Sequence, residues 1–331
     1  MAELVLAEGP ALEQILDATY DIWHEGLDRR AYARYNAAQV ATPWGRTHLS
    51  RLALVDRGDV RASAKLYTFD ATLDGRSIRV AGIGAVFTQP AHRKRGAAKE
   101  LIERLLEHAS AEGAPGADVA LLFSEIGPEY YARLGFSPLA TAEQQIRVIE
   151  ATRYGAPATW VRGGDDRDFP VLAALGETRA TPFRFHLNRD RDLIHYAIAK
   201  KRLLAGLGPV GARELHFFAA EEGASAVAYV VVSVTGRAER EAVWTIEECG
   251  DRDPTGARVG AILQALVARD PAERRPVIRG WLPAGFRPPQ IEIVGEQQSR
   301  DVMMVKPLTP AGEGALTLSA DQLLYWRGDA F

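Results

Sequence analysis

Cysteine is nearly absent from this chain, because Cys249 is the only one among 331 residues. A single thiol excludes an intramolecular disulfide and a cysteine-rich metal site. The seven histidines are scattered without a pair spaced like metal ligands, so we expect no metal. No apolar run approaches the ~20 residues that span a bilayer, and the acidic stretch Met1–Glu8 is too poor in apolar residues for a signal peptide. These absences predict a cytoplasmic protein that has no membrane partner.

Positive charge is not in excess either. Lys and Arg number 40 against 43 Asp and Glu, which gives a net charge of −3. Nucleic-acid-binding proteins usually present a basic face, so we expect no nucleic-acid partner. Hydrophobic residues make up 47% of the chain, which is enough for a core, and 331 residues favour two domains of ordinary size.

Strand and helix signals alternate along the first half of the chain. Apolar residues at helical spacing, such as Leu12, Ile15 and Leu16, predict helices, and short apolar runs predict strands. Asp74-Gly75 is a hairpin signal between two such runs. The predicted strands lie at 4–7, 52–55, 60–69, 80–87 and 118–123, and the predicted helices at 10–27, 30–40, 96–113 and 128–134.

The pattern weakens near residues 150–165, where we place a boundary between domains 1–148 and 149–331. The second half repeats the order of elements, with low residue identity. This repeat predicts a duplicated α/β domain with a mixed sheet in each copy. The second-half elements are helices at 169–175, 190–204 and 255–268 and strands at 214–219, 226–234 and 242–247.

Basic and small residues meet where a predicted strand is followed by a helix, in the run Pro90–Leu101. The first N–H groups of a helix have no intrahelical acceptor, and the helix dipole adds partial positive charge, so this junction predicts an anion site. Gly96, Ala97 and Ala98 are small enough to let a bulky anion approach the backbone. The equivalent stretch of the second half, 247–256, is acidic and would repel a phosphate, which leaves one anion site.

The spacing Arg93-x-x-Gly96-x-Ala98 after a strand resembles the signature of the GNAT superfamily of acyl-CoA-dependent N-acyltransferases. Pro90 stands three residues before Arg93, as in many members of that superfamily. The segment Tyr130–Phe136 is similar to the family's Phe-Tyr-x-x-Leu-Gly-Phe segment. The resemblance covers roughly residues 4–140 and implies a GNAT fold, duplicated here with a degenerate second copy.

Two subfamilies resemble the chain in different motifs. The run Pro90–Gly96, the pair Ser124-Glu125 and a second GNAT-like half are similar to the Eis-type tandem acetyltransferases. The chain lacks the length for the third, sterol-carrier-like domain of that group, and it spaces Ser124 and Tyr131 more widely. The segment Phe123–Tyr131 also resembles the lysine N6-acetyltransferases of fungi.

The resemblance implies acetyl-CoA, or another acyl-CoA, as cosubstrate and no metal. The pyrophosphate would lie on the N–H groups of residues 95–99, and the strand edge at 86–88 would bind the pantetheine arm as an added strand does. The cofactor-binding residues that we expect are Val86, Phe87, Thr88, Arg93, Lys94, Arg95, Gly96, Ala97, Ala98, Lys99, Ser124 and Glu125.

Acyl transfer from a thioester to an amine needs a base, an oxyanion donor and an acid. By resemblance, Tyr131 is the acid that protonates the leaving sulfur, and the N–H of Phe87 or a neighbour holds the oxyanion. Residues 80–88 contain no carboxylate that could act as base. The Eis-type enzymes use their own C-terminal carboxylate, so Phe331 is our candidate, with Glu125 and His92 in reserve.

The last seven residues hold three aromatic side chains, and an apolar chain end predicts docking. Return of Phe331 to the first domain and packing of this end on the second domain both stay open. The expected acceptor is a primary amine: an amino acid, a lysine side chain, a polyamine or an aminoglycoside. Residues expected near the acceptor are Trp23, Tyr32, Tyr35, Trp44 and Phe69, with Glu25, Asp28 and Asp70 to attract an ammonium.

A second hypothesis is a non-catalytic acyl-CoA-binding sensor, in which the second half serves as effector or dimerisation domain. The intact Tyr131 favours the enzyme, because a sensor needs no acid. A homo-oligomer is left open by the sequence.

Overall fold

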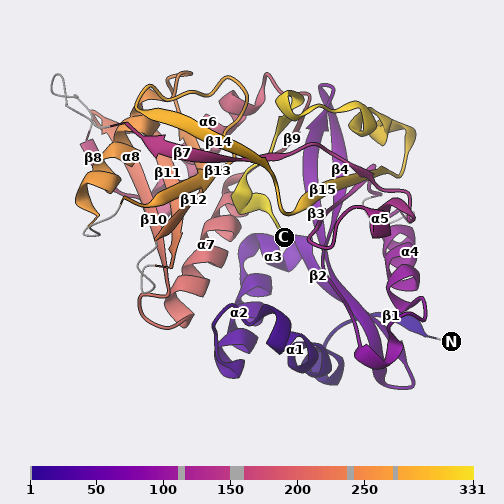
Figure 1. Cartoon of the computed structure of the whole chain (residues 1–331). Helices are drawn as coiled ribbons and strands as arrows, with labels where there is room; N and C mark the ends of the chain where they lie inside the picture. Colours follow the sequence, from indigo (N-terminus) through magenta and orange to yellow (C-terminus); the bar gives the residue numbers. More distant parts are fainter. Residues whose placement is uncertain (1, 111–115, 150–159, 237–241, 271–274) are drawn as a thin grey trace.

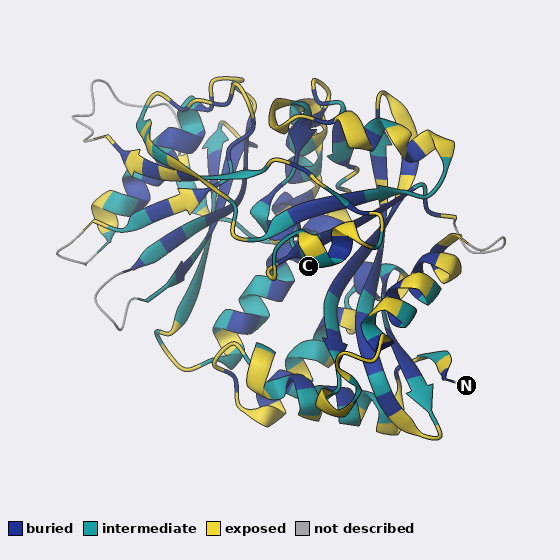
Figure 2. Cartoon of the chain, turned by 45° about the vertical axis from the view of Figure 1, so that its right-hand side comes forward, coloured by how far each residue is buried: buried dark blue, intermediate teal, exposed yellow. Residues whose placement is uncertain are grey.

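A computed structural model describes residues 2–110, 116–149, 160–236, 242–270 and 275–331. Two mixed β-sheets stand side by side, with helices α2, α3 and α7 between their lower ends (Figure 1). Buried residues gather on the central strands of both sheets, and exposed residues lie on the outer helices and loops (Figure 2). Among the described helices, none is long and apolar enough to cross a membrane.

The first sheet has the order β1-β2-β3-β4-β5-β15-β6, with β9 and β16 joined at the side of β3. Strands β2, β3 and β4 form an antiparallel meander, and β5 lies parallel to β4. The β3–β4 hairpin turns at Asp74 and Gly75, which both have positive φ, as the Asp-Gly signal predicts. The bounds are β1 (Glu3–Leu6), β2 (Leu49–Asp56), β3 (Asp59–Leu73), β4 (Arg76–Thr88), β5 (Val119–Ser124), β6 (Ser137–Pro138), β9 (Phe185–Leu187), β15 (Val302–Pro307) and β16 (Leu323–Leu324).

Helices of the first half cover the two faces of this sheet. Helix α4 buries Leu101, Ile102 and Leu105 and exposes its charged face, as its 3.6-residue period predicts. The predicted helix 10–27 ends at Trp23, because Glu25 and Gly26 take the left-handed conformation. The helices are α1 (Gly9–Trp23), α2 (Arg29–Ala41), α3 (Pro43–His48), α4 (Ala97–Ser110) and α5 (Glu129–Ala132). The expected end of α4 at Gly113 lies outside the described residues.

The second sheet repeats the plan of the first in the order β14-β7-β13-β12-β11-β10-β8. Strands β10, β11 and β12 form the antiparallel meander, and β13 lies parallel to β12. The bounds are β7 (Ala142–Val148), β8 (Trp160–Gly163), β10 (Arg213–Glu222), β11 (Ser225–Thr235), β12 (Val243–Asp251), β13 (Val277–Gly280), β14 (Ile291–Gln298), α6 (Phe169–Ala180), α7 (Arg191–Leu207) and α8 (Ala257–Arg269). The predicted mixed α/β class is thereby confirmed.

Each half gives strands to the other half's sheet: the second half supplies β9, β15 and β16 to the first sheet, and the first half supplies β7 to the second sheet. Strand β7 of the first half lies between β13 and β14, and β15 of the second half lies between β5 and β6. Strands β7 and β15 take equivalent places in the two sheets. Strand β15 lies beside β5, which is parallel to β4, and β7 lies beside β13, which is parallel to β12. The division at residues 148 and 149 stays a prediction about independent domains, and the exchange means that no single cut separates the sheets.

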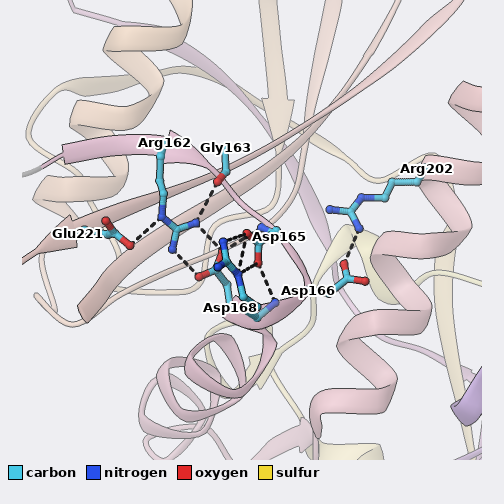
Figure 3. A network of polar contacts seen from close by, with 8 residues as sticks. Arg162, Gly163, Asp165, Asp166, Asp168, Arg202 and Glu221 are labelled. Atoms are coloured by element: carbon cyan, nitrogen blue, oxygen red, sulfur yellow. Dashed lines mark hydrogen bonds and ion pairs between the residues drawn. The ribbon is translucent and has the colours of Figure 1, made fainter. Parts of the chain in front are cut away.

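An ion-pair network fixes α7 to the edge of the second sheet (Figure 3). Arg162 on β8 binds both oxygens of Asp168 at 2.6 and 2.8 Å and Glu221 on β10 at 2.7 Å. Arg202 on α7 binds Asp166, in the same short turn as Asp168, at 2.8 Å. The bidentate Arg162–Asp168 pair fixes the short turn at 166–168 against β8. Helix α7 joins this network only through the exposed single contact of Arg202 with Asp166.

The C-terminal segment crosses back from the second half to the first. After β15, the 3₁₀ turns Pro310–Thr317 and Ala320–Gln322 lead to β16, which pairs in parallel with β9. A last turn, Arg327–Asp329, brings the chain end to the space between the sheets (Figure 1).

A carboxylate of the chain occupies the start of α8, the position equivalent to the basic junction before α4. Asp251 accepts hydrogen bonds from the N–H groups of Asp253 (2.9 Å), Arg258 (2.8 Å) and Val259 (3.2 Å). The Asp251 side chain is buried, and Arg258 also reaches it at 3.3 Å. The second half therefore supplies its own anion to this helix N-terminus.

We expect Asp251→Ala to lower the free energy of unfolding by about 2–4 kcal/mol, because it leaves buried N–H groups and Arg258 without their acceptor. Urea denaturation measures the change. Asp253→Ala is the matched control, since Asp253 caps Thr255 at the surface and its loss should cost about 1 kcal/mol or less. Equal losses in both variants would contradict the role given to Asp251.

Candidate active site

The strands β4 and β5 separate at the centre of the first sheet. Their parallel pairing runs from Val80 beside Val119 to Ile83 beside Leu122 and then stops, while β4 continues along β3 to Thr88. A bulge at Ala85, which has φ 49°, accompanies the separation. Among the described residues, the edge of β4 from Val86 to Thr88 on the side of β5 therefore has no strand partner. An extended ligand can add to such an edge.

The basic junction follows directly. The turn Pro90–His92 leads to Lys94 and Gly96, which both have positive φ (58° and 84°), and α4 begins at Ala97. Alternation of these conformations directs successive N–H groups to one side, as in anion-binding nests. At the start of α4, the N–H of Glu100 donates to the carbonyl of Gly96 at 2.9 Å and begins the hydrogen bonding of the helix. A Cβ at Gly96 would meet no atom within 4 Å, so the space above the loop is open.

Residues after β5 form the opposite rim of the gap. The buried Ser124 hydroxyl donates to the carbonyl of Gly127 at 2.6 Å and so holds the turn that leads to α5. Glu125 is exposed and Tyr131, on α5, is buried. Burial raises the pKa of Tyr131 to about 12, with the neighbouring Tyr130 and Glu125 acting in the same direction. The Tyr131 phenol is therefore protonated at neutral pH.

The last residue of the chain lies in the same gap. The Phe331 ring packs against the rings of Tyr67, Phe69 and Phe123 at centroid distances of 4.7, 5.5 and 5.2 Å. A Cβ at Gly84 would lie 3.0 Å from the carboxyl carbon of Phe331, so only glycine leaves room for the chain end. The terminal carboxylate therefore stands beside β4, next to the bulge.

Residues of the second half hold this chain end in place. Lys200 on α7 donates to the carbonyl of Ala330 at 2.8 Å. Buried Arg189 pairs with Asp329 at 3.0 Å and also with Glu248. Arg327 pairs with Asp301 at 2.7 Å. Several charge-assisted bonds fix the backbone just before Phe331.

One cavity of about 510 Å³ joins the gap to the space between the two halves. Its polar wall comes from β2, β3, α2 and α7, and its apolar wall from the Phe331 ring and its neighbours. The lining residues include Trp23, Glu25, Tyr32, Tyr35, Gln39, Arg51, Lys65, Tyr67, Ala85, Val86, Phe123, Glu125, Tyr131, Lys200, Lys201, Arg213, Arg327 and Phe331. Of the reserve bases, Glu125 lines this cavity, whereas His92 belongs to the turn Pro90–His92.

The residues expected near the acceptor divide into two groups. Trp23, Tyr32 and Tyr35 line the cavity, while Trp44 and Phe69 stack on one another at 5.2 Å in the core beneath it. The acidic residues are committed elsewhere: Glu25 pairs with Arg213, Asp28 caps α2 through the N–H of Ala31, and Asp70 lies 3.8 Å from Arg79.

Sequence reasoning missed the cations of this cavity, chiefly Arg51, Lys65 and Lys200. A signal existed for Lys200, because it continues the buried stripe Leu193, Ala197 and Leu204 of α7, where a lysine is unusual. Lys65 stands within the long β3 between buried Ala64 and Leu66. Charged residues in apolar stripes are candidates for functional sites.

A strand separation lies beside a loop with an anion-binding conformation, and a phenol and a carboxylate line the adjoining cavity. This arrangement has room for an extended, anionic ligand. Residues 13–139 match the acetyltransferase (GNAT) domain family. Residues 13–139 therefore match the domain of a family whose members use acyl-CoA, and the activity of the whole chain is a matter for proposal. A search of curated proteins found no match.

Solved structures share the fold of the whole chain. A GCN5-related N-acetyltransferase from Anabaena variabilis matches with a TM-score of 0.67 and 12% identity, over 93% of this chain and 73% of that one. Eis1 from Mycobacterium abscessus matches with a TM-score of 0.56 and 17% identity, over 93% of this chain and 74% of that one. The Saccharomyces cerevisiae N-myristoyltransferase with bound myristoyl-CoA matches with a TM-score of 0.54 and 9% identity, over 94% of this chain and 86% of that one. The expected tandem GNAT-like fold is thereby confirmed.

We expect Gly96→Val to raise the dissociation constant of acetyl-CoA by about tenfold or more, because a branched side chain both strains the positive φ and covers the loop. Isothermal titration calorimetry measures this binding. Gly58→Val is the matched control, since Gly58 has a similar φ of 87° and open space, in the β2–β3 turn. Both variants should lose similar stability, and weaker acetyl-CoA binding in both would contradict a specific role of the loop.

Proposed function

We propose that this protein transfers an acyl group from acetyl-CoA, or another acyl-CoA, to a primary amine by direct attack. The observation that carries the proposal is the one cavity that both Phe331 and Tyr131 line, with the chain end of Phe331 beside Gly84 of β4. The diphosphate of CoA would lie on the N–H groups of residues 95–99, near Arg93 and Lys94. The pantetheine arm would extend along Val86, Phe87 and Thr88 and bring the thioester to the bulge.

The reaction follows from these positions. The amine nitrogen attacks the thioester carbonyl while its proton passes to the carboxylate of Phe331, directly or through water. A backbone N–H of Phe87 or a neighbour holds the oxyanion of the tetrahedral intermediate. Collapse of the intermediate breaks the C–S bond, and the Tyr131 phenol gives its proton to the sulfur of the leaving CoA. Return of the proton from the carboxylate to the phenolate, through solvent, completes the cycle.

Structure around each group supports its role. A carboxylate at the end of a chain anchored by its own ring is held in position without a long flexible side chain, and such pre-orientation lowers the barrier. Tyr131 is the phenol whose raised pKa keeps it protonated, as an acid must be. Ser124 fixes the turn between them, and Glu125 adds a negative charge to the rim.

We expect Tyr131→Phe to lower kcat by ~10²-fold with little effect on thermal stability, because the ring stays and the proton donor is lost. Release of thiol from acetyl-CoA over a panel of amines measures the rate. Tyr130→Phe is the matched control, since Tyr130 is the adjacent ring and should leave kcat within about twofold. Unchanged turnover of Tyr131→Phe would remove this phenol from the mechanism.

The chain end offers a second test. Adding one glycine after Phe331 keeps the ring but moves the carboxylate by about 3.5 Å, so we expect kcat to fall by ~10²-fold. Deletion of Phe331 should have at least the same effect. Phe331→Leu is the control that keeps a carboxylate at the native position with a smaller anchor, and it should retain most of the activity. An extended chain as active as the native one would exclude the terminal carboxylate as base.

Binding of acetyl-CoA without turnover on any amine would instead support a non-catalytic sensor.

A further inference from the structure

Three cations on one side of the cavity have no acidic partner. Arg51, Lys65 and Lys200 come from β2, β3 and α7, and within the described residues no carboxylate lies at ion-pair distance from any of them. Each donates to a neutral oxygen instead. The bonds are Arg51 to Asn36 Oδ1 (2.7 Å), Lys65 to Gln39 Oε1 (3.2 Å) and Lys200 to the carbonyl of Ala330 (2.8 Å).

The other cations of the same cavity are neutralised. Arg213 pairs with Glu25, and Lys201 pairs with Glu247 at 3.1 Å. Arg327 pairs with Asp301 at 2.7 Å. Three of the cations that line the cavity are thus compensated, and Arg51, Lys65 and Lys200 have no acidic partner among the described residues. Buried charges without a counter-ion are costly, so an anionic ligand would stabilise this side of the cavity.

The three uncompensated cations lie close enough to act on one another. Burial, together with the nearby charges of Arg51 and Lys200, lowers the pKa of Lys65 well below its usual range. Burial and the neighbouring Lys201 lower the pKa of Lys200 to about 7. A cluster of this kind attracts an anion, because one anionic group can interact with all three at once.

Sheet register places this cluster beside the reacting atoms. Lys65 stands opposite Gly84 in the β3–β4 ladder, and Gly84 touches the terminal carboxylate of Phe331. Among the described residues, no direct ion pair joins that carboxylate to Arg51, Lys65 or Lys200, so an anion can still bind these three residues directly. An anion held here would stand next to the amine that attacks the thioester.

We propose that Arg51, Lys65 and Lys200 form a subsite for an anionic group of the acceptor, so that the substrate is a primary amine carrying a carboxylate or a phosphate. This inference rests on the proposed acyl transfer and narrows its acceptor. Arg51 supplies a planar fork that can bind two oxygens of the anion. The two lysines supply point charges in their protonated form, which a bound anion favours. Polyamines and other purely cationic amines are poor acceptors by the same electrostatics.

Acceptor preference should depend on pH in a defined direction. The groups that face Lys200 are Lys65, Tyr196, Lys201, Glu247, Arg327 and Asp329, besides the carbonyl of Ala330. Because the pKa of Lys200 is lowered to about 7, its charge is present below that pH and is lost above it. The ratio of kcat/KM for an anionic acceptor to that for its neutral analogue should therefore fall as pH rises through about 7. Each kcat/KM is first corrected for the free-amine fraction of its own acceptor, because the charged and neutral members of a pair differ in amine pKa.

The test compares matched amines. Omega-amino acids of increasing chain length are paired with their carboxamides, and aminoalkyl phosphates with the corresponding amino alcohols. Binding is measured by calorimetry with CoA present, and turnover by thiol release from acetyl-CoA. We expect about tenfold or more preference for the charged member in both assays. The carboxylate and phosphate arms identify which anion the subsite takes.

Variants locate the preference. Lys65→Met and Arg51→Gln should each reduce the preference toward unity in both assays. Arg202→Gln, on the same helix as Lys200 but paired with Asp166 outside the cavity, should keep it. Equal affinity of the native protein for charged and neutral amines would overturn the proposal without any variant. Selective binding of charged amines without turnover would keep the subsite and overturn the proposed acyl transfer.

Discussion

Docking of the C-terminal segment between the two sheets organises this molecule. The Phe331 ring packs among aromatic residues of β3 and β5, while ion pairs from the second half hold the preceding residues. Hydrophobic burial supplies attraction without direction, and the buried pair of Arg189 with Asp329 and Glu248 supplies direction. The cavity exists only because both act together, since its walls belong to both halves and its floor is the chain end.

Local features of the site could be predicted from the sequence, and features made by distant segments could not. The junction Pro90–Leu101 and the segment around Tyr131 each consist of a few adjacent residues. Their patterns were therefore visible in the sequence and pointed to the GNAT domain that residues 13–139 match. Most strands and helices also followed from periodicity. Exchange of β7 and β15 between sheets was invisible, because strand pairing across more than a hundred residues leaves no local signal.

The cluster of Arg51, Lys65 and Lys200 could not be predicted from the sequence for the same reason. Arg51, Lys65 and Lys200 are far apart in the chain, and although Lys200 interrupts an apolar stripe of α7, no local pattern links the three residues. Only the packing of α7 against the first half reveals that they share one wall. The aromatic residues of α1 and α2 suggested a site for a cation, whereas the charges found there favour an anion, because glutamate and aspartate in this region are already paired or used as caps.

The exchange of strands has a consequence for how the chain matures during synthesis. Until residue 307 has emerged from the ribosome, β5 at the centre of the first sheet presents an open edge. The nascent GNAT half can therefore form its meander and its cofactor loop early, but it must wait for nearly the whole chain before its sheet is complete. A shortened translation product would carry a recognisable acetyltransferase domain and an unprotected strand edge, which makes it a target for chaperones and proteases rather than a smaller enzyme.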